Sequence, residues 1–279
     1  MEGELEWDRL HQTLYATDAS VYKILPLAVA FPKNDNDLIL LIDFARAHQT
    51  SLIPRTAGTS LAGQCVGKGI VVDLSKHFTA ILDLDIAGQS VRVQPGVNRD
   101  ALNDYLKPHG LFFGPNTSTS AFCMMGGMVG NNSSGTTSIR YGVTRDQVLE
   151  LETLLSDGSK AIFKGIGEDE FTLKTQEQSL EGAIYSYFQQ TLSQATVRQK
   201  IEEDFPEARF HPLPTTLDLP DRRRLHWLQC HRENEPIPFL DKEQSNEPPF
   251  GPLQNLRPGG IHGLRCDRSS RSGVARDRR

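Results

Sequence analysis

The order of apolar and polar residues along the chain predicts a succession of helices and short strands. Within residues 35–49, apolar positions starting at Leu38 recur at i, i+3, i+4 and i+7, which is typical of an amphipathic helix. Asp35 or Asn36 is placed to cap the start of that helix. Alternating or β-branched runs follow it and predict strands at 51–54, 69–74, 80–85 and 90–96.

Further along, the pattern predicts a second helix, a hairpin and a long third helix. Residues 98–110 place Leu102 and Leu106 on one helix side, and Pro108 and Gly110 end it. Residues 146–165 alternate around Asp157-Gly158, which indicates a hairpin with a tight turn. Residues 180–205 predict one helix whose apolar stripe is Leu180, Ala183, Ile184, Tyr187, Phe188, Thr191 and Leu192.

This order lacks the strict alternation of strand and helix that a doubly wound parallel sheet requires. It therefore favours an α+β fold. The length of 279 residues allows one large domain or two smaller ones. No apolar run approaches the roughly 20 residues needed to cross a bilayer, and the acidic N-terminus is unlike a secretory signal.

Charge and cysteine usage narrow the class of protein. The net charge of −5 argues against nucleic acid as the main partner. Four widely spaced cysteines, without a C-x-x-C pair, are unlike a disulfide framework and indicate a reducing compartment. A cytoplasmic location is the expectation.

Composition changes near residue 205. Residues 206–279 hold ten of the sixteen prolines and twelve of the twenty arginines, but only one lysine. We expect an irregular tail there without regular packing, arising from a changed reading frame, a degraded gene copy or a natural disordered segment. Its histidines and cysteines fit no zinc spacing, so no metal site is expected. Its arginine runs are interleaved with acidic residues and lack an aromatic platform for nucleic acid.

Two long segments of small residues, 54–64 and 116–138, stand out between the predicted strands. Glycine, serine and threonine let a backbone approach a ligand closely, and consecutive amides can converge on an anion such as a diphosphate. An ordinary surface loop is the alternative for either segment alone. No G-x-G-x-x-G follows a strand, and the spacing of "GQCVGKG" (63–69) does not fit a phosphate-binding P-loop.

Several ordered motifs carry a family resemblance, among them "IPRTAGTSLAGQ", "VQPGVNRDALNDYLKPHGLFFGPNTST", "GGMVGNNSSG" and "YGVTRDQVLELETLLSDG". Together they resemble the FAD-binding domain of vanillyl-alcohol oxidase / p-cresol methylhydroxylase-type flavoproteins, over about residues 10–205. The D-lactate, glycolate and D-2-hydroxyglutarate dehydrogenase group is the most similar. The resemblance implies an N-terminal extension at 1–23, an FAD-binding domain of two small α+β subdomains at 24–205 with an incomplete second subdomain, and a tail at 206–279.

The resemblance also implies the residues that bind FAD. The first loop would wrap the diphosphate and the second would line the other side of the flavin. A histidine that tethers flavin covalently in some relatives is replaced by Thr59, so FAD is expected to be noncovalent. The implied residues are Arg55, Thr56, Ala57, Gly58, Thr59, Ser60 and Gln64 in the first loop, and Ser118, Thr119, Gly126, Gly127, Asn131 and Ser134 in the second.

For function, the resemblance implies an FAD-dependent oxidoreductase that oxidises a small D-2-hydroxy acid by hydride transfer to FAD. Counterparts of the substrate-binding cap are not recognisable, so no catalytic residue is assigned, and a noncatalytic FAD-binding fragment is the alternative. Partners implied by full-length relatives are an electron acceptor, an iron–sulfur module suggested by "YATDASVYKILPLAVAFP", and a peripheral place at the inner face of the membrane.

Overall fold

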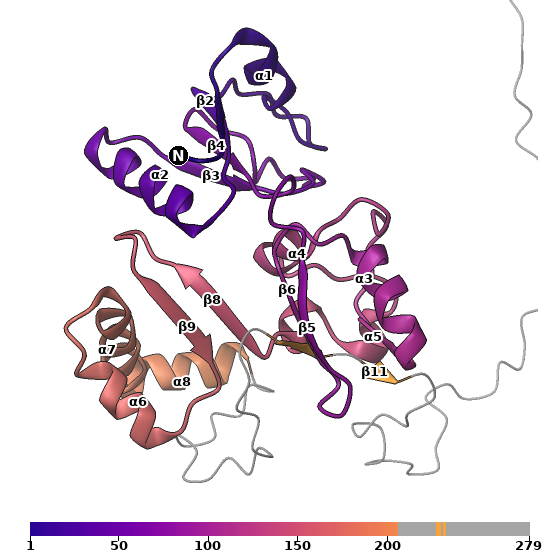
Figure 1. The fold of residues 1–279 in the computed structure, drawn as a ribbon. Coiled ribbons are helices and arrows are strands. Elements are labelled where there is room, and N and C mark those ends of the chain that lie inside the picture. The colour runs from indigo at the N-terminus through magenta and orange to yellow at the C-terminus, as the bar shows by residue number, and fades with distance from the viewer. Residues whose placement is uncertain (206–226, 230, 233–279) are drawn as a thin grey trace, which may run out of the picture. The chain divides into compact units, whose positions relative to one another are not determined.

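A four-stranded sheet forms the N-terminal part of the computed structural model, which describes residues 1–205, 227–229 and 231–232 (Figure 1). Its strand order is β1 (Glu4–Glu6), β2 (Ala28–Phe31), β4 (Ile70–Asp73) and β3 (Leu52–Arg55). The last three strands are parallel, and β1 is antiparallel to β2. The sheet is therefore mixed, which confirms the α+β class over a wholly parallel sheet.

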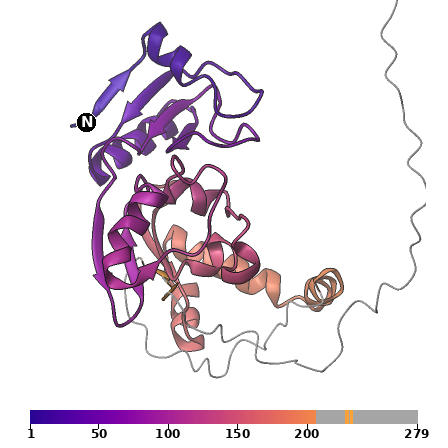
Figure 2. The same ribbon diagram turned by 90° about the vertical axis from the view of Figure 1, so that its right-hand side faces the viewer.

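Alternate residues of the buried strands point to opposite sides of the sheet, so both faces carry apolar side chains. Other elements cover both faces. Helix α2 (Asp35–Ala47) lies along one face, where Leu41 packs with Ala30 and Val72 (Figures 1 and 2). Tyr15, which follows helix α1 (Arg9–Leu14), packs on the other face against Val29, Phe31 and Val71. The chain before residue 24, expected to be an extension, thus supplies both an edge strand and part of the core.

The predicted N-cap of α2 was wrong by one or two residues. Asn34, and not Asp35 or Asn36, has the extended backbone of an N-cap, and its side chain accepts a hydrogen bond from the Asp37 amide at 3.0 Å. The reason is that Asp37 is buried and turned toward the amides of Glu2, Gly3 and Lys33. Starting the helix at Asp35 places Asp37 in the first turn, where an acidic group is favourable.

A second core lies further along the chain. It joins strands β5 (Ile81–Asp85) and β6 (Ser90–Val93), helices α3 (Arg99–Leu106) and α4 (Met125–Gly130), and strand β7 (Leu111–Phe112). The short helix η1 (Lys107–His109) connects α3 to β7. The predicted helix side is confirmed, since Leu102 and Leu106 are fully buried. They pack with Val91, Leu111, Phe113 and Met128. The two separate cores correspond to the two small subdomains expected from the sequence.

Two short strands lie in the segment that we expected to be without regular packing. β10 (Trp227–Gln229) pairs antiparallel with β6, and β11 (His231–Arg232) pairs antiparallel with β7. The expectation of an irregular segment is therefore wrong for these five residues, whose backbone hydrogen-bonds to strand edges left open by the rest of the domain. The remainder of the expected tail, including the suggested change near Pro206, lies outside the described residues.

The hairpin was predicted correctly and the helix after it was not. β8 (Glu150–Leu154) and β9 (Lys160–Lys164) pair antiparallel around Gly158. The expected helix at 180–205 is two helices, α7 (Leu180–Leu192) and α8 (Ala195–Asp204), and α6 (Glu168–Thr175) precedes them. The break follows from side-chain hydrogen bonds to carbonyls at the end of α7, from Ser193 to Gln190 and from Arg198 to Leu192.

The apolar stripe predicted for this helix is not its buried side. Tyr187 and Phe188 are 65 % and 51 % exposed, whereas Glu181 and Gly182 are buried. Gly182 lies against the backbone of Glu177, so the N-terminal turn of α7 is the part that packs closely. Among the described residues, no helix has the length and apolar character needed to span a membrane.

Candidate functional site

The two small-residue loops line one cavity of about 770 Å³. This volume falls within the roughly 300–1,000 Å³ common for small-molecule and cofactor sites. Twelve of the thirteen residues expected to bind FAD line it, and Ala57 is the exception. Most of the lining comes from residues 54–65, at and after the end of β3, and from 117–134, which include helix α4 (Met125–Gly130); Leu74 and Pro95 complete it. Two segments far apart in sequence are therefore brought together at one cavity.

The first loop keeps a run of amide groups available. Within the described part of the chain, the amides of Thr56, Ala57, Gly58, Thr59 and Ser60 donate to no protein acceptor. Amides that lack a partner are costly unless solvent or a ligand accepts from them. Five consecutive donors beside a cavity suit a ligand with several closely spaced acceptor oxygens, and a diphosphate has that arrangement.

A chain of side-chain hydrogen bonds ties the first loop to the second. Ser60 Oγ donates to Gln64 Oε1 at 2.6 Å, and Gln64 Nε2 donates to Asn131 Oδ1 at 3.0 Å. Asn131 Nδ2 in turn donates to Ser133 Oγ at 3.2 Å. Three of the residues expected to bind FAD, namely Ser60, Gln64 and Asn131, thus also fix the separation of the two walls.

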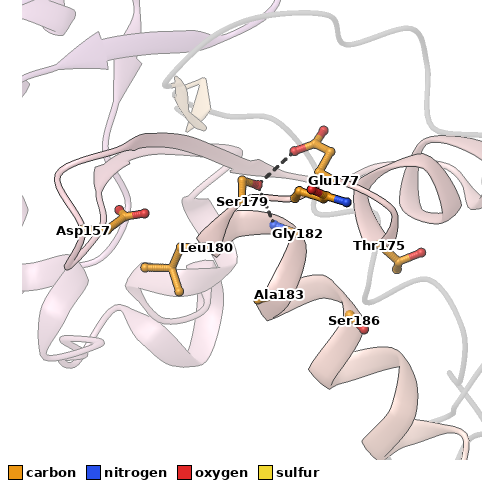
Figure 3. A pocket seen from close by; sticks show the side chains of 9 residues that line it. Asp157, Thr175, Glu177, Ser179, Leu180, Gly182, Ala183 and Ser186 are labelled. Carbon is orange, nitrogen blue, oxygen red and sulfur yellow. Dashed lines mark hydrogen bonds between the residues drawn. The ribbon is translucent and has the colours of Figure 1, made fainter.

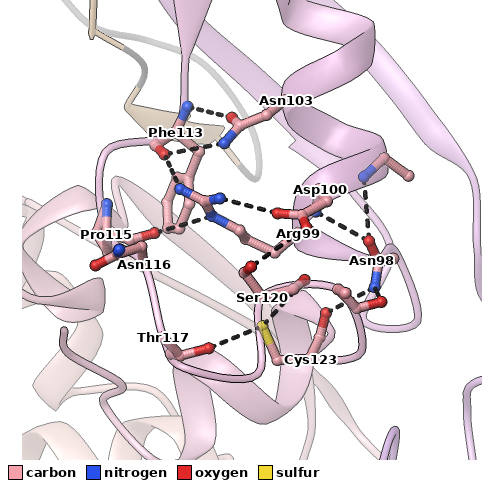
Figure 4. A network of polar contacts seen from close by, with 12 residues as sticks. Asn98, Arg99, Asp100, Asn103, Phe113, Pro115, Asn116, Thr117, Ser120 and Cys123 are labelled. Carbon is pink, nitrogen blue, oxygen red and sulfur yellow. Dashed lines mark hydrogen bonds and ion pairs between the residues drawn. The ribbon is translucent and has the colours of Figure 1, made fainter. Parts of the chain in front are cut away.

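The start of the second loop is held by polar side chains of α3 (Figure 4). Arg99 donates to the Pro115 carbonyl at 3.2 Å and to Asp100 at 2.9 Å, and it is only 15 % exposed at its side chain. Asn103 accepts from the Phe113 amide at 2.7 Å. Ser120 Oγ donates to the other oxygen of Asp100 at 3.2 Å. This network fixes the segment that carries Ser118 and Thr119 on the cavity wall.

The far end of the second loop is anchored to the short helix η2 (Thr144–Gln147). Thr144 is fully buried, and its amide and hydroxyl both donate to the Ser133 carbonyl, at 3.1 and 2.6 Å. The Arg145 amide donates to Asn132 Oδ1 at 3.0 Å. These contacts position Ser134, which lines the cavity.

Several lining residues were not identified from the sequence. Cys65 and Cys123 are buried thiols in the cavity walls, and burial raises the pKa of the Cys65 thiol, which keeps it neutral. Their neighbourhood in the small-residue segments was the available signal. Pro95 and Met124 gave none, because their place depends on how α4 meets the end of β6. The other lining residues outside the expected set include Thr117, Asn132 and Ser133.

The donor set fits an anionic cofactor that is bound through its shape and its diphosphate. Among the described residues that line the cavity, Arg55 carries the one charged side chain, and none is a histidine. The acceptor oxygens of a diphosphate would therefore meet neutral amides and hydroxyls beside a single cation. Glu6, Asp8 and His11 bring potential metal ligands within 4.8 Å of one another, but they do not line this cavity, and Asp8 and His11 are already paired.

A second cavity of about 540 Å³ lies at the N-terminal end of α7 (Figure 3). Its polar groups are engaged in capping the helix. Ser179 accepts from the Gly182 amide at 3.0 Å and donates to Glu177 at 3.4 Å. The carboxyl groups of Asp157 and Glu177 at its wall make it unsuited to a diphosphate.

Comparison with known proteins agrees with the geometry of the first cavity. Residues 26–161 match the family described as FAD binding domain. D-2-hydroxyglutarate dehydrogenase of Pseudomonas putida is 38 % identical over 208 residues, covering 74 % of this chain and 20 % of that protein. Glycolate oxidase subunit GlcD of Bacillus subtilis is 35 % identical over 147 residues, covering 52 % of this chain and 31 % of the subunit. The chain thus spans a fifth to a third of the length of these relatives.

Solved structures share the fold at lower identity. 6-Hydroxy-D-nicotine oxidase from Arthrobacter nicotinovorans superposes with a TM-score of 0.54 at 20 % identity, over 61 % of this chain and 38 % of that one. Alkyldihydroxyacetonephosphate synthase gives a TM-score of 0.53 at 20 % identity, over 60 % of this chain and 34 % of the other. These similarities concern the fold alone.

Proposed function

We propose that the cavity lined by residues 54–65 and 117–134 is an FAD site, since residues 26–161 match the FAD binding domain family. We propose further that the chain is the FAD-binding part of a dehydrogenase for small D-2-hydroxy acids. The observation that carries the site is the run of five amides, Thr56 to Ser60, which donate to no acceptor within the described part of the chain. Similarity to D-2-hydroxyglutarate dehydrogenases and a glycolate oxidase subunit supports the substrate class.

In this proposal the first loop binds the FAD diphosphate through main-chain amides. Amides need no side-chain ordering to act as donors, and a preformed loop lowers the entropy cost of binding. Gly126, Gly127 and Asn131 face the ligand from the second loop, and Gln64 keeps the two walls in register. When bound at these residues, FAD would supply the hydride acceptor for oxidation of the substrate. No residue of this chain is assigned to proton abstraction from the substrate.

We propose that the cofactor is held noncovalently. Thr59 occupies the position at which some family members have a tethering histidine, and no described residue that lines the cavity is a histidine. Acid precipitation of the loaded protein should therefore leave the flavin in the supernatant. Flavin that stays with the precipitate would contradict this part of the proposal.

Two glycine variants test the site. Gly58 has a left-handed backbone (φ +67°), and a Cβ there would lie 2.4 Å from Arg55 Nη2. A Cβ at Gly127 would lie 2.8 Å from Thr56 Oγ1, at the contact between the two loops. Gly58→Val and Gly127→Val should each abolish FAD binding, measured as the flavin-to-protein absorbance ratio after gel filtration.

Gly167→Val is the matched control, because Gly167 does not line the cavity and a Cβ there meets no atom within 4 Å. It should retain FAD as the wild type does. Unchanged flavin occupancy in Gly58→Val and Gly127→Val would argue against both loops as the FAD site.

Turnover is tested by adding D-2-hydroxyglutarate, D-lactate or glycolate to the FAD-loaded chain and following flavin absorbance. Bleaching by one of them supports the dehydrogenase. A flavin that is inert toward all three supports the alternative, a noncatalytic FAD-binding fragment. An electron acceptor, an iron–sulfur module and a cytoplasmic or peripheral membrane location belong to the same proposal and rest on family resemblance.

A further inference from the structure

A small closed loop precedes the part of the chain that matches the FAD binding domain family. The Ile24 amide donates to the Ala16 carbonyl at 2.9 Å, and Thr17 pairs antiparallel with Lys23. We call residues 16–24 the N-terminal loop. Within it, the Ser20 amide donates to Asp18 at 2.8 Å, so the tip of the loop is ordered by its own contacts.

The N-terminal loop contacts the first FAD loop in the middle of the run of free amides and again beyond its end. The Ala19 amide donates to the Gly58 carbonyl at 3.2 Å. Beyond the run, Cys65 Sγ donates to Asp18 Oδ2 at 3.6 Å. The N-terminal loop thus contacts a carbonyl and a side chain of the first loop. It does not use the free amides of residues 56–60.

Tyr22 adds an apolar contact. Gly63 has a left-handed backbone (φ +72°), and a Cβ there would lie 2.6 Å from Cδ2 of the Tyr22 ring. The ring therefore packs directly on the backbone where the first loop turns. Tyr22 is 55 % exposed and is not part of the sheet core, so removal of its ring should leave that core intact.

Arg55, at the start of the first loop, is held from the same segment. Its Nη1 donates to the Thr17 carbonyl at 2.7 Å, and its guanidinium lies 5.1 Å from the centre of the Tyr15 ring. Tyr15 is itself fixed, because its hydroxyl donates to the buried Asp73 at 2.5 Å. Arg55 carries the one charged side chain among the described residues that line the cavity. It is thus oriented by Tyr15 and Thr17, which lie outside both FAD loops.

These contacts meet a physical requirement of the proposed site. A loop whose amides are kept for a ligand cannot use those amides to hold its own shape, so its conformation must be held by other groups. Inside the first loop, Ser60 Oγ accepts from the amides of Ala62 and Gln64, which orders only the second half. The N-terminal loop contacts both halves, the first at Arg55 and Gly58 and the second at Gly63.

We propose that the N-terminal loop is a positioning element of the FAD site, which holds residues 55–65 in the conformation that leaves the amides of 56–60 free for the diphosphate. This inference rests on the proposed FAD site. By thermodynamic linkage, a loop that favours FAD binding must in turn be stabilised by FAD, so the cofactor should slow amide hydrogen exchange in residues 16–24 as well.

The test uses the full chain and the variant Tyr22→Ala, with Tyr22→Phe as the conservative rescue. Glu4→Gln is the matched control. Glu4 also lies near the N-terminus, and its substitution removes the ion pair with Lys76. Glu4 does not contact the first loop. We expect Tyr22→Ala to weaken FAD binding about tenfold, within the range usual for coupled sites. Tyr22→Phe and Glu4→Gln should bind FAD as the wild type does. Without FAD, the amides of this loop that do have an acceptor, those of Ala62 and Gln64, should exchange faster in Tyr22→Ala alone.

A wild-type dissociation constant and wild-type exchange of the Ala62 and Gln64 amides in Tyr22→Ala would overturn the inference. If the wild-type chain binds no FAD, but these amides still exchange faster in Tyr22→Ala, the proposed cofactor is refuted. The positioning role of the N-terminal loop then stands. If Tyr22→Ala does not fold, Asp18→Asn, which weakens the contact with Cys65, gives the same comparison. Wild-type binding and exchange in Asp18→Asn would then overturn the inference.

Discussion

Helix α4 carries three glycines whose surroundings differ enough to make a sharp test of the cavity wall. The Gly126 amide donates to the Pro95 carbonyl at 2.8 Å. A Cβ on Gly126 would lie 2.5 Å from Pro95 Cβ and 3.1 Å from its carbonyl oxygen. A Cβ on Gly130, in the last position of the same helix, would meet no atom within 4 Å. Gly126→Ala and Gly130→Ala therefore add the same methyl group to one helix. Neighbouring atoms leave no room for it at Gly126, whereas at Gly130 there is room.

The expected magnitudes follow from these distances. The added methyl at Gly126 meets a proline ring and a backbone, neither of which has a flexible end to move, so α4 must shift and strain its bond to Pro95. Overpacking of this kind costs about 1–3 kcal/mol, from which at most about 1 kcal/mol of helix propensity gained by alanine is subtracted. Because the added Cβ would lie only 2.5 Å from Pro95 Cβ, the cost falls in the upper part of that range. We therefore expect Gly126→Ala to lower the free energy of unfolding by about 1–2 kcal/mol, and Gly130→Ala to leave it unchanged or raise it.

The assay is thermal unfolding of both variants without FAD, followed by circular dichroism. In a domain of about 200 residues, 1 kcal/mol corresponds to a shift of about 2–4 °C in Tm. An FAD titration of Gly126→Ala should also show weaker binding, since α4 carries Gly127 into the cavity wall. A Gly126→Ala variant that melts at or above the wild-type temperature would refute the close approach of α4 to Pro95.

Three further predictions concern other parts of the domain. The Asp37 carboxylate accepts hydrogen bonds from the amides of Glu2, Gly3 and Lys33. Burial raises the pKa of Asp37, but these hydrogen bonds outweigh burial, so the folded-state pKa lies below the usual value. The carboxylate therefore stabilises the fold above about pH 4, and this stabilisation is lost as the pH falls through the folded-state pKa. Asp37→Asn should thus cost about 1–3 kcal/mol in urea unfolding at pH 7, and a difference that persists undiminished at pH 2 would contradict this reasoning. Asn131→Ala should weaken FAD binding by breaking the link to Gln64 while changing stability by less than about 1 kcal/mol, checked by FAD titration and Tm together. Leu102→Ala should cost about 2–5 kcal/mol, because Leu102 is fully buried in the second core, and a loss below 1 kcal/mol in urea unfolding would show that this core is poorly packed.

Elements with a clear local period were predictable from the sequence. Leu102 and Leu106 repeat at helical spacing and are both fully buried, and the hairpin around Gly158 forms as its alternation and turn residues indicate. The stripe on α7 failed because periodicity shows which residues share a helix face, but not which face the rest of the fold covers. Tyr187 and Phe188 share a face that stays exposed, while the packed side of that helix is its N-terminal turn at Gly182.

The site residues were predictable to the extent that their chemistry is local. Glycine, serine and threonine in long loops mark where a backbone can approach a ligand, and twelve of the thirteen residues that the family resemblance implied line one cavity. Arg99 and Thr144 left no comparable signal. Their role is to hold carbonyls of the second loop, at Pro115 and Ser133, and it depends on contacts between residues that are 11 to 16 positions apart.

The support of the first loop extends beyond residues 26–161, the part of the chain that matches the FAD binding domain family. The amides of Thr56 to Ser60 cannot serve both the loop and a ligand, so the conformation of the loop depends on carbonyls, side chains and packing contacts supplied by neighbours. Those neighbours are Gln64 and Asn131 on one side and the N-terminal loop on the other. A substitution in residues 15–22 should therefore act on cofactor affinity even though none of these residues lines the cavity, whereas one on the exposed face of α7 should not. Binding residues are recognised by what they offer the ligand, and the residues that keep those groups free are recognised only from the structure.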